Sequence, residues 1–352
     1  VFGAEPPFDG TIREASDGSL YAFMVPPFVS NHASSLEVLP DGTLVAAWFS
    51  GEAEEANKCA IVVATLPAKG AQWSNATVIS MQDGFSDQNP VVFYDNKTRV
   101  LNVFHSHAPA MSGETQAQIW LVQSHDGGHS WGSPAPYITT PGAFPRNRII
   151  PSLDGSLIFP YYSASEDSKT FNDDNYSILG KSDASHASFK PYPIKGSADL
   201  VQPTVVRLTP KEPGKLKAYF RDRRAESVYA ATSTDEGVTW EIPSKTSLPN
   251  NNAGIEAFTL SSGRTAIVYN NKAGSGPRTP LTISLSENHG TTWPYTRNLQ
   301  VKDDELLEGS SHVEYSYPSL LQTSDGMIHV TYTYDRLTIK YRAFTEEWVM
   351  SG

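Results

Sequence analysis

The stretch SHDGGHSW at residues 124–131 decides the fold, because it returns as STDEGVTW at 233–240 and as SENHGTTW at 286–293. Each copy has an Asp or Asn at its third position, a Gly at its fifth and a Trp at its end. An Asp or Asn side chain bonds to the backbone of its own turn, Gly adopts a positive φ without strain, and Trp fills the hydrophobic layer below. The phrase therefore predicts a tight turn between two strands.

Two weaker copies extend the repeat to five. SDASHASF at 182–189 keeps the two ends of the phrase, and LPAKGAQW at 66–73 keeps the Gly and the Trp. The closing aromatic residues stand at 73, 131, 189, 240 and 293, in steps of 58, 58, 51 and 53, and one more step of 55 reaches Trp348. A period near 50 residues is typical of a propeller. We therefore predict one all-β domain over residues 1–352, a β-propeller of six four-stranded blades, with seven blades left open.

Short runs rich in Val, Ile, Tyr and Thr supply the strands between the turns. No stretch has a helical period, and tandem β-sandwiches would need linkers that the sequence does not show. Leu20–Val25 is expected to add a strand to the last blade and so close the ring. The other predicted strands are Ser35–Leu39, Thr43–Phe49, Ala60–Thr65, Pro90–Tyr94, Val100–His105, Arg148–Leu153, Leu157–Tyr162, Thr204–Leu208, Lys217–Arg221, Ile255–Leu260, Thr265–Asn270, Pro318–Gln322 and Ile328–Tyr334.

Composition excludes several classes of function. The 27 Lys and Arg against 38 Asp and Glu give a net charge of −11, spread without an acidic block, which argues against nucleic acid or an anionic membrane as partner. No apolar run approaches the length of about 18 residues that a membrane span needs. Cys59 is the one cysteine, so an internal disulfide and a Cys-based metal site are excluded. Three N-glycosylation sequons, at Asn75, Asn96 and Asn175, favour an extracellular location.

The repeated turns resemble the Asp-box of the sialidase superfamily, and the resemblance covers about residues 30–342. Segments 202–240, 249–293 and 315–342 are similar, almost continuously, to the branch of sialidase-like proteins with Asp-box repeats. Such turns identify architecture rather than chemistry, so the site is expected at the central mouth. The resemblance implies a sugar carboxylate held by three Arg, a nucleophilic Tyr whose proton a Glu accepts, and an Asp as acid/base.

This chain keeps part of that pattern. Arg221 matches the second family Arg, Arg278 matches the third, and Tyr317 matches the nucleophilic Tyr. Two positions depart, because His32 stands at the first Arg and Gln202 at the Glu. The loop where the acid/base Asp is expected offers three glutamates out of register, Glu52, Glu54 and Glu55.

The departures change the expected chemistry. A phenol with a pKa of about 10 is a poor nucleophile unless a carboxylate takes its proton, and Gln202 is an amide. Arg221 and Arg278 still form charge-assisted forks on a carboxylate. We therefore expect β-elimination beside a uronate, by a polysaccharide lyase. The change of Arg to His resembles related propellers that release rhamnose from glucuronate at glycan ends.

Three side chains are candidates to move the proton: His32, His105 and Tyr317. Imidazole titrates near neutral pH, and His105 and His107 alternate along one strand, so they face the same side. Further sugar contacts are expected at the starts of inner strands or in the loops before them. These are Asn89, Arg148 and Asn252, beside Gln202.

Two alternatives of other classes stay open. A sialidase-like exo-glycosidase would replace the missing carboxylates by one of Glu54, Glu55, Glu256 or Glu314. A non-catalytic glycan-binding propeller would keep the arginines without the chemistry, and both arginines would be structural if they paired with Asp222 or Glu256. In every case an acidic oligosaccharide or polysaccharide is the expected partner of a monomer. No metal site is predicted from side chains, while a calcium ion on backbone carbonyls of the central channel is left open.

Overall fold

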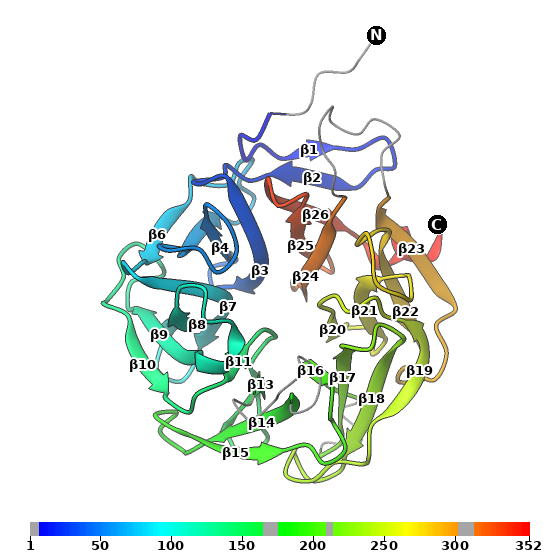
Figure 1. Cartoon of the computed structure of the whole chain (residues 1–352). Helices are drawn as coiled ribbons and strands as arrows, with labels where there is room; N and C mark the ends of the chain where they lie inside the picture. Colours follow the sequence, from blue (N-terminus) through cyan, green and yellow to red (C-terminus); the bar gives the residue numbers. More distant parts are fainter. Residues whose placement is uncertain (1–6, 165–174, 209–213, 302–312) are drawn as a thin grey trace.

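The computed structural model describes residues 7–164, 175–208, 214–301 and 313–352. Within them, six antiparallel sheets follow one another around a central axis in chain order (Figure 1). Each sheet is built on four strands, and the inner strands β3, β7, β16, β20 and β24 surround the axis. The predicted fold, an all-β propeller of six blades, is confirmed.

The strands of the blades have the following bounds. The first blade holds β3 (Ser30–Val38), β4 (Leu44–Gly51), β5 (Ala60–Leu66) and β6 (Thr77–Ser80), and the second holds β7 (Phe85–Asp95), β8 (Val100–Pro109), β9 (Gln118–Ser124) and β10 (Ala135–Ile138). The third holds β11 (Ala143–Pro145), β12 (Ile150–Pro151), β13 (Leu157–Ser163), β14 (Tyr176–Ser182) and β15 (Phe189–Pro193). The fourth holds β16 (Leu200–Arg207), β17 (Leu216–Asp222), β18 (Ser227–Ser233) and β19 (Ser244–Pro249), and the fifth holds β20 (Glu256–Thr259), β21 (Thr265–Asn270), β22 (Leu281–Ser286) and β23 (Tyr295–Gln300).

The sixth blade joins the two ends of the chain. It consists of β24 (Tyr315–Gln322), β25 (Ile328–Tyr334) and β26 (Thr338–Phe344), to which the N-terminal β2 (Leu20–Phe23) and β1 (Arg13–Glu14) are added. β2 pairs antiparallel with β26 (Figure 1). The predicted closure of the ring by the N-terminal segment is therefore confirmed.

The last turn was predicted wrongly. Trp348 does not close a sixth turn phrase but lies in a short helix, α1 (Glu346–Met350), which Thr345 caps by accepting a hydrogen bond from the Trp348 backbone N–H at 3.2 Å. Its indole packs on Phe344, with ring centroids 4.6 Å apart. Because β2 already supplies the fourth strand of this blade, the chain needs no turn into another strand after β26. A single 3-10 turn, η1 (Glu114–Gln116), is the other helical element of the described residues.

The three full turn phrases hold their own hydrogen bonds. In the first, Asp126 Oδ1 accepts from the Ser130 backbone N–H at 2.9 Å, and Ser124 Oγ accepts from that of Gly128 at 2.8 Å. The second and third repeat this pattern, with Asp235 and Asn288 accepting from the residue four further on. These turns join the third and fourth strands of their blades, as predicted.

Four inner strands begin earlier than predicted, and each extension carries a bulge. Strands β3, β7, β16 and β24 all shift register near their first residues. One residue of each bulge has a positive φ: 57° at Ala33, 46° at Asn89, 51° at Gln202 and 51° at Tyr317. Such a conformation is uncommon for residues other than glycine, and bulges re-aim side chains next to active sites. The bulges therefore gather several predicted site residues around the axis.

Candidate active site at the mouth of the propeller

Tyr317 lies at the centre of the candidate site. Its phenol oxygen accepts a hydrogen bond from Arg221 Nη1 at 2.5 Å and a longer one from Gln202 Nε2 at 3.4 Å. The strand β17 delivers Arg221 near its end, while bulges deliver Gln202 and Tyr317. Two donors thus converge on one phenol oxygen, an arrangement that favours negative charge there.

Three guanidinium groups surround the same ring. Those of Arg146, Arg221 and Arg278 lie 5.2, 5.6 and 5.2 Å from the Tyr317 ring centroid. Burial alone would raise the pKa of Tyr317, but the positive charges of Arg221 and Arg278 outweigh it, so this pKa lies below its ordinary value. The sequence paired Arg221 and Arg278 with Tyr317, and the structure brings all three together.

Glu314 bridges two arginines beside this ring. Its Oε1 accepts from Arg278 Nη1 at 2.6 Å and its Oε2 accepts from Arg336 Nε at 2.8 Å. Burial raises the pKa of Glu314, yet the permanent positive charges of Arg278 and Arg336 hold it well below its usual range. The carboxylate is therefore ionised, and it fixes both guanidinium groups.

Sequence reasoning missed Arg336 as a member of this site. Arg336 stands in the turn between β25 and β26, with a positive φ of 56°. Its Nη2 lies 3.5 Å from His32 Nε2, so it occupies the side of the site where the resemblance placed a first Arg. Arg336 lies in the segment 315–342 that resembles the family, but no turn phrase or single matched position marked it.

His32 packs against Tyr317 and is fully buried. The two ring centroids are 4.2 Å apart, and His32 Nδ1 lies 2.8 Å from Thr333 Oγ1. Burial, followed by the positive charge of Arg336, lowers the pKa of His32 well below its ordinary value. A neutral imidazole with so low a pKa is a weak base, and this favours Tyr317 over His32 as the group that moves a proton.

Asn252 positions an arginine. Its Oδ1 accepts a hydrogen bond from Arg221 Nε at 2.8 Å, which orients the guanidinium toward Tyr317. Gln202 Oε1 is buried and has no hydrogen-bond partner among the described residues, so the amide keeps one acceptor available beside Tyr317. The predicted roles of both residues as direct sugar contacts stay predictions.

The arginines do not form the ion pairs that were left open. Asp222 accepts from Arg224 Nε at 2.8 Å, and Arg221 turns to Tyr317 instead. Glu256 accepts from the Leu320 backbone N–H at 2.8 Å, deep in the channel. Arg278 does form an ion pair, but with Glu314.

His105 belongs to a different cluster. His107 Nδ1 lies 2.6 Å from Asp87 Oδ1, and His105 Nδ1 lies 3.8 Å from the same oxygen, so the two imidazoles do face one side. His105 is fully buried, and none of the described contacts joins it to Tyr317. Asn89 forms the bulge of β7 in the same blade, and its contact with a sugar stays a prediction.

Arg148 lies in the axial channel rather than at the mouth. Its Nη2 donates to the backbone carbonyls of Leu36 at 2.9 Å and Leu320 at 3.1 Å, several residues farther along β3 and β24 than the bulges. Its Nη2 is thus bonded to carbonyls of the channel, and the predicted contact of Arg148 with a sugar stays a prediction.

Arg146 bonds channel carbonyls in the same way, nearer the mouth. Its Nη1 donates to Ser34 O at 3.1 Å and its Nη2 to Pro318 O at 2.7 Å. Backbone carbonyls that a channel cation would use are thus bonded to guanidinium groups. No cluster of three His, Cys, Asp or Glu side chains able to hold a metal ion occurs in the described part of the chain.

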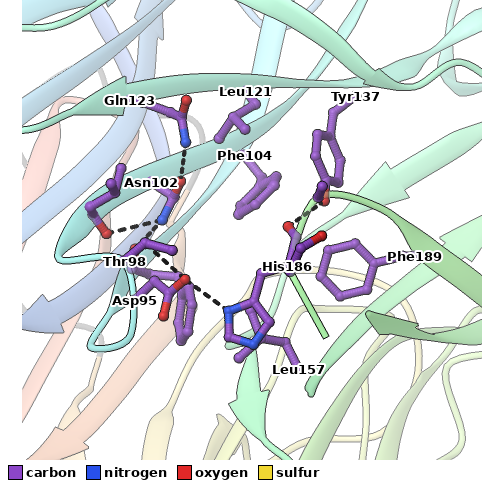
Figure 2. Close-up of a pocket in the computed structure, with 14 residues that line it drawn as sticks. Asp95, Thr98, Asn102, Phe104, Leu121, Gln123, Tyr137, Leu157, His186 and Phe189 are labelled. Carbon is purple, nitrogen blue, oxygen red and sulfur yellow. Dashed lines mark hydrogen bonds and ion pairs between the residues drawn. The ribbon is translucent and has the colours of Figure 1, made fainter. Parts of the chain in front are cut away.

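The far end of the propeller has a cavity of another kind. A cavity of about 340 Å³ opens between the second and third blades, as Figure 2 shows. Its polar groups bond to one another: His186 Nδ1 lies 2.8 Å from Asp95 Oδ2, and Gln123 Nε2 donates to Asn102 Oδ1 at 2.9 Å (Figure 2). His186 belongs to one of the weaker turn phrases, so this cavity lies with the turns and away from Tyr317.

Comparison with known protein families assigns the chain to one of them. The model of the BNR repeat-like domain matches residues 42–330, and the chain belongs to this family. No curated protein matches significantly.

Several sialidases have the same fold. The Hadza microbial sialidase Hz136 superposes with a TM-score of 0.76 at 17% identity, over 92% of this chain and 67% of that one. The intramolecular trans-sialidase of Ruminococcus gnavus, solved with oseltamivir carboxylate, gives 0.73 at 15% identity, over 93% and 97%. A leech intramolecular trans-sialidase gives 0.75 at 15% identity, over 99% and 71%. The family match and this shared fold agree with the predicted resemblance to the sialidase superfamily, and the likeness to the solved structures shows the fold alone.

Proposed function

We propose that this protein is a glycan-cleaving enzyme that acts at the carboxylate of an acidic sugar. Membership of the BNR repeat-like family and the fold shared with sialidases support a glycan as substrate. The residues of the mouth support an anionic glycan, because Arg221 and Arg278 lie beside Tyr317 and Arg336 lies beside His32, in a protein whose overall charge is −11. A local positive field of this kind attracts an anion regardless of net charge.

The preferred reaction is β-elimination at a uronate, and one observation carries it. The Tyr317 phenol oxygen accepts from Arg221 and Gln202, and no carboxylate is hydrogen-bonded to it in the described residues. Arginine charges rather than a glutamate therefore lower its pKa. The same charges stabilise the phenolate form of Tyr317, which is the form that accepts a proton without help from a second base.

The step balances on the residues present. The Tyr317 phenolate takes the proton from C5 of the uronate, the C5–H electron pair forms the C4–C5 double bond, and the C4–O bond breaks. The departing oxygen then takes the proton from the Tyr317 phenol, which returns to the phenolate. Arg278 and Arg221 stabilise the charge that develops on the carboxylate as C5 loses its proton. At a rhamnosyl-glucuronate end, the products are rhamnose and an unsaturated uronate.

A retaining exo-glycosidase is the second candidate, and the position of Glu54 beside the arginine cluster favours it. Glu54 Oε2 lies 2.7 Å from Arg336 Nη1, and its charge is close enough to oppose the lowering of the Tyr317 pKa. In this reaction Tyr317 attacks the anomeric carbon, Glu54 protonates the leaving oxygen, and water later cleaves the glycosyl-tyrosine. Glu54 is the one candidate glutamate of its loop that is ion-paired to the arginine cluster among the described residues.

Product analysis separates these reactions. The enzyme is incubated with a glycan ending in rhamnosyl-glucuronate and, separately, with a sialylated glycan. Elimination yields a double bond conjugated to the carboxylate, with strong ultraviolet absorbance, and the released sugar appears in equal amount. Sugar release without this absorbance contradicts the lyase and supports the glycosidase. Retention of the glycan without release supports a glycan-binding propeller instead.

An extracellular, monomeric protein fits this proposal. Two of the three sequons, at Asn75 and Asn96, are exposed, whereas Asn175 is buried with 6% of its surface accessible. None of the described helices is long and apolar enough to cross a membrane. Glycan analysis of the protein isolated from its source is expected to find sugar at Asn75 or Asn96 and none at Asn175.

A further inference from the structure

The cluster on the β25–β26 side of the mouth contains one ion pair that folding does not require. Glu314 holds Arg278 and Arg336 from within, since only 2% of its side chain is accessible. Glu54 meets Arg336 from outside, with 40% of its side chain accessible. An exposed pair of this kind contributes little to stability, so its role is to be sought in binding.

Arg336 has the geometry of a carboxylate ligand. Its Nε is fixed by Glu314 at 2.8 Å and its Nη2 lies 3.5 Å from His32 Nε2, so the plane of the guanidinium group is set by buried partners. The remaining Nη1 points to a carboxylate already, that of Glu54, at 2.7 Å. A preorganised guanidinium with 27% of its side chain accessible is a ready binding group for an anion.

Arg278 lies on the other side of the same carboxylate. Its Nη1 donates to Glu314 Oε1 at 2.6 Å, and its guanidinium carbon lies 5.2 Å from the Tyr317 ring centroid. Glu314 thus ties two partly accessible guanidinium groups into one unit beside the proton-carrying phenol. Together they offer more positive charge than the one buried carboxylate neutralises.

We propose that Arg336 joins Arg278 in binding the sugar carboxylate, and that Glu54 is an internal competitor that the substrate carboxylate displaces from Arg336. This inference rests on the proposed function, because it assumes that an acidic sugar enters this mouth. The competition makes binding selective, since a neutral sugar has no charge with which to replace Glu54. In this proposal Arg336, in the turn after β25, takes the role that the resemblance gives to an arginine at the position of His32 in the first blade.

The experiment measures the dissociation constants of D-glucuronate and of its neutral methyl ester by calorimetry. Wild type is compared with Glu54→Gln, Arg336→Ala, Arg336→Lys and Arg278→Ala. Glu52→Gln is the matched control, because Glu52 is exposed in the same loop and carries the same charge change without contacting Arg336. Thermal melts confirm that each variant is folded.

Glu54→Gln is expected to tighten glucuronate binding about threefold to tenfold, because an ion-pair competitor is removed. The same variant leaves the methyl ester unchanged, and Glu52→Gln leaves both ligands unchanged. Arg336→Ala weakens glucuronate binding about tenfold or more, and Arg336→Lys recovers part of the loss. In the double variant that combines Glu54→Gln with Arg336→Ala, the gain in affinity from Glu54→Gln disappears.

Two results overturn the inference while the proposed function stands. The first is that Arg336→Ala binds glucuronate as tightly as wild type while Arg278→Ala binds it more weakly. The second is that Glu54→Gln does not tighten glucuronate binding. If wild type and Arg278→Ala both fail to discriminate glucuronate from its methyl ester, carboxylate recognition itself is absent, and the proposed function falls with the inference. Loss of turnover in Glu54→Gln without tighter binding assigns Glu54 to the glycosidase reaction and also overturns the competitor role.

Discussion

The two ends of this propeller satisfy their polar groups in opposite ways. At the far end, the Asp or Asn of each full turn phrase accepts a hydrogen bond from the backbone of the same turn. In the cavity there, the side chains of Asp95 and His186 bond to each other. At the mouth, three guanidinium groups surround the ring of Tyr317, and the polar groups bond between strands that are far apart in the sequence. The turns at the far end therefore stabilise the fold. The mouth instead gathers like charges around one phenol, an arrangement that costs stability and suits a reactive site.

The difference teaches where to look for function in a repeat protein. The turn phrases are the most regular part of the sequence, yet they lie away from the chemistry. The site consists of residues that no turn phrase marks, such as Tyr317 in the bulge of β24 and Arg336 in the turn before β26. Substitutions at the two ends should therefore separate activity from stability.

The largest effect is expected from Tyr317→Phe. Removal of the phenol oxygen deletes the proton carrier and should lower kcat about 10³-fold to 10⁴-fold, while the ring still fills its place beside His32. Initial rates on the preferred glycan and a circular dichroism melt provide the two measurements. Turnover within tenfold of wild type would show that another group moves the proton.

Glu314→Gln tests the comparison from the side of stability. Among the residues of the mouth, Glu314 should contribute most to the free energy of unfolding. Loss of the buried carboxylate leaves Arg278 and Arg336 facing each other and should cost about 3–5 kcal/mol of unfolding free energy. Urea denaturation measures the loss. A change no larger than that of an exposed substitution would remove Glu314 from its bridging role.

The same residue predicts a pH dependence. The pKa of Glu314 is lowered on folding, so its contribution is fully present above its ordinary value of 4.5 and is lost as the pH falls below it. Wild type should therefore lose stability below that pH more steeply than Glu314→Gln does. Parallel curves for the two proteins would contradict the assignment.

A smaller effect on activity is expected from Arg278→Ala. Loss of one charge-assisted fork at the carboxylate should lower kcat/KM about 10²-fold to 10³-fold. Arg278→Lys should recover only part, since a point charge does not make both bonds. Steady-state kinetics with the acidic glycan test this, and full recovery by Lys would indicate a purely electrostatic role.

The smallest effect is expected from Asp235→Ala at the far end. The variant loses the hydrogen bonds from the Thr239 backbone N–H and hydroxyl, at 2.9 and 2.6 Å. The melting temperature should fall by about 2–4 °C, as for a loss of roughly 1 kcal/mol in a chain of this size, with kcat unchanged. A marked loss of kcat with an unchanged melting temperature would reverse the proposed division between the two ends.

The sequence predicted the fold because turns and strand spacing are local features. The phrase ending at Trp240 and its relatives reported the period directly, and Leu20–Val25 was placed correctly in the last blade. Trp348 was misplaced because closure of the ring by β2 changes what the chain does after β26. Spacing alone does not show that a blade takes its fourth strand from the other terminus.

The site was predicted only where a motif marked it. Arg221, Arg278 and Tyr317 match single positions of the family pattern. Glu314 was one of four candidate glutamates that no motif separated, and Arg336 meets His32 only after strands distant in sequence pack together. Arg148 was predicted as a sugar contact because it begins the predicted strand Arg148–Leu153. The step from Arg146 to Arg148 carries the side chain along the axis into the channel, and only the register of the folded strand reveals that.

The central claim is that Tyr317 is an acidified phenol, and its ionisation tests that claim most directly. Tyrosinate absorbs in the ultraviolet, so subtracting the pH titration of Tyr317→Phe from that of wild type isolates one of the 16 tyrosines. We predict a midpoint below the ordinary pKa of 10.0, since Arg221 and Arg278 outweigh burial. The midpoint should rise in Arg221→Ala, where a positive neighbour is lost. A wild-type midpoint at or above the ordinary value would contradict the proposed role of Tyr317.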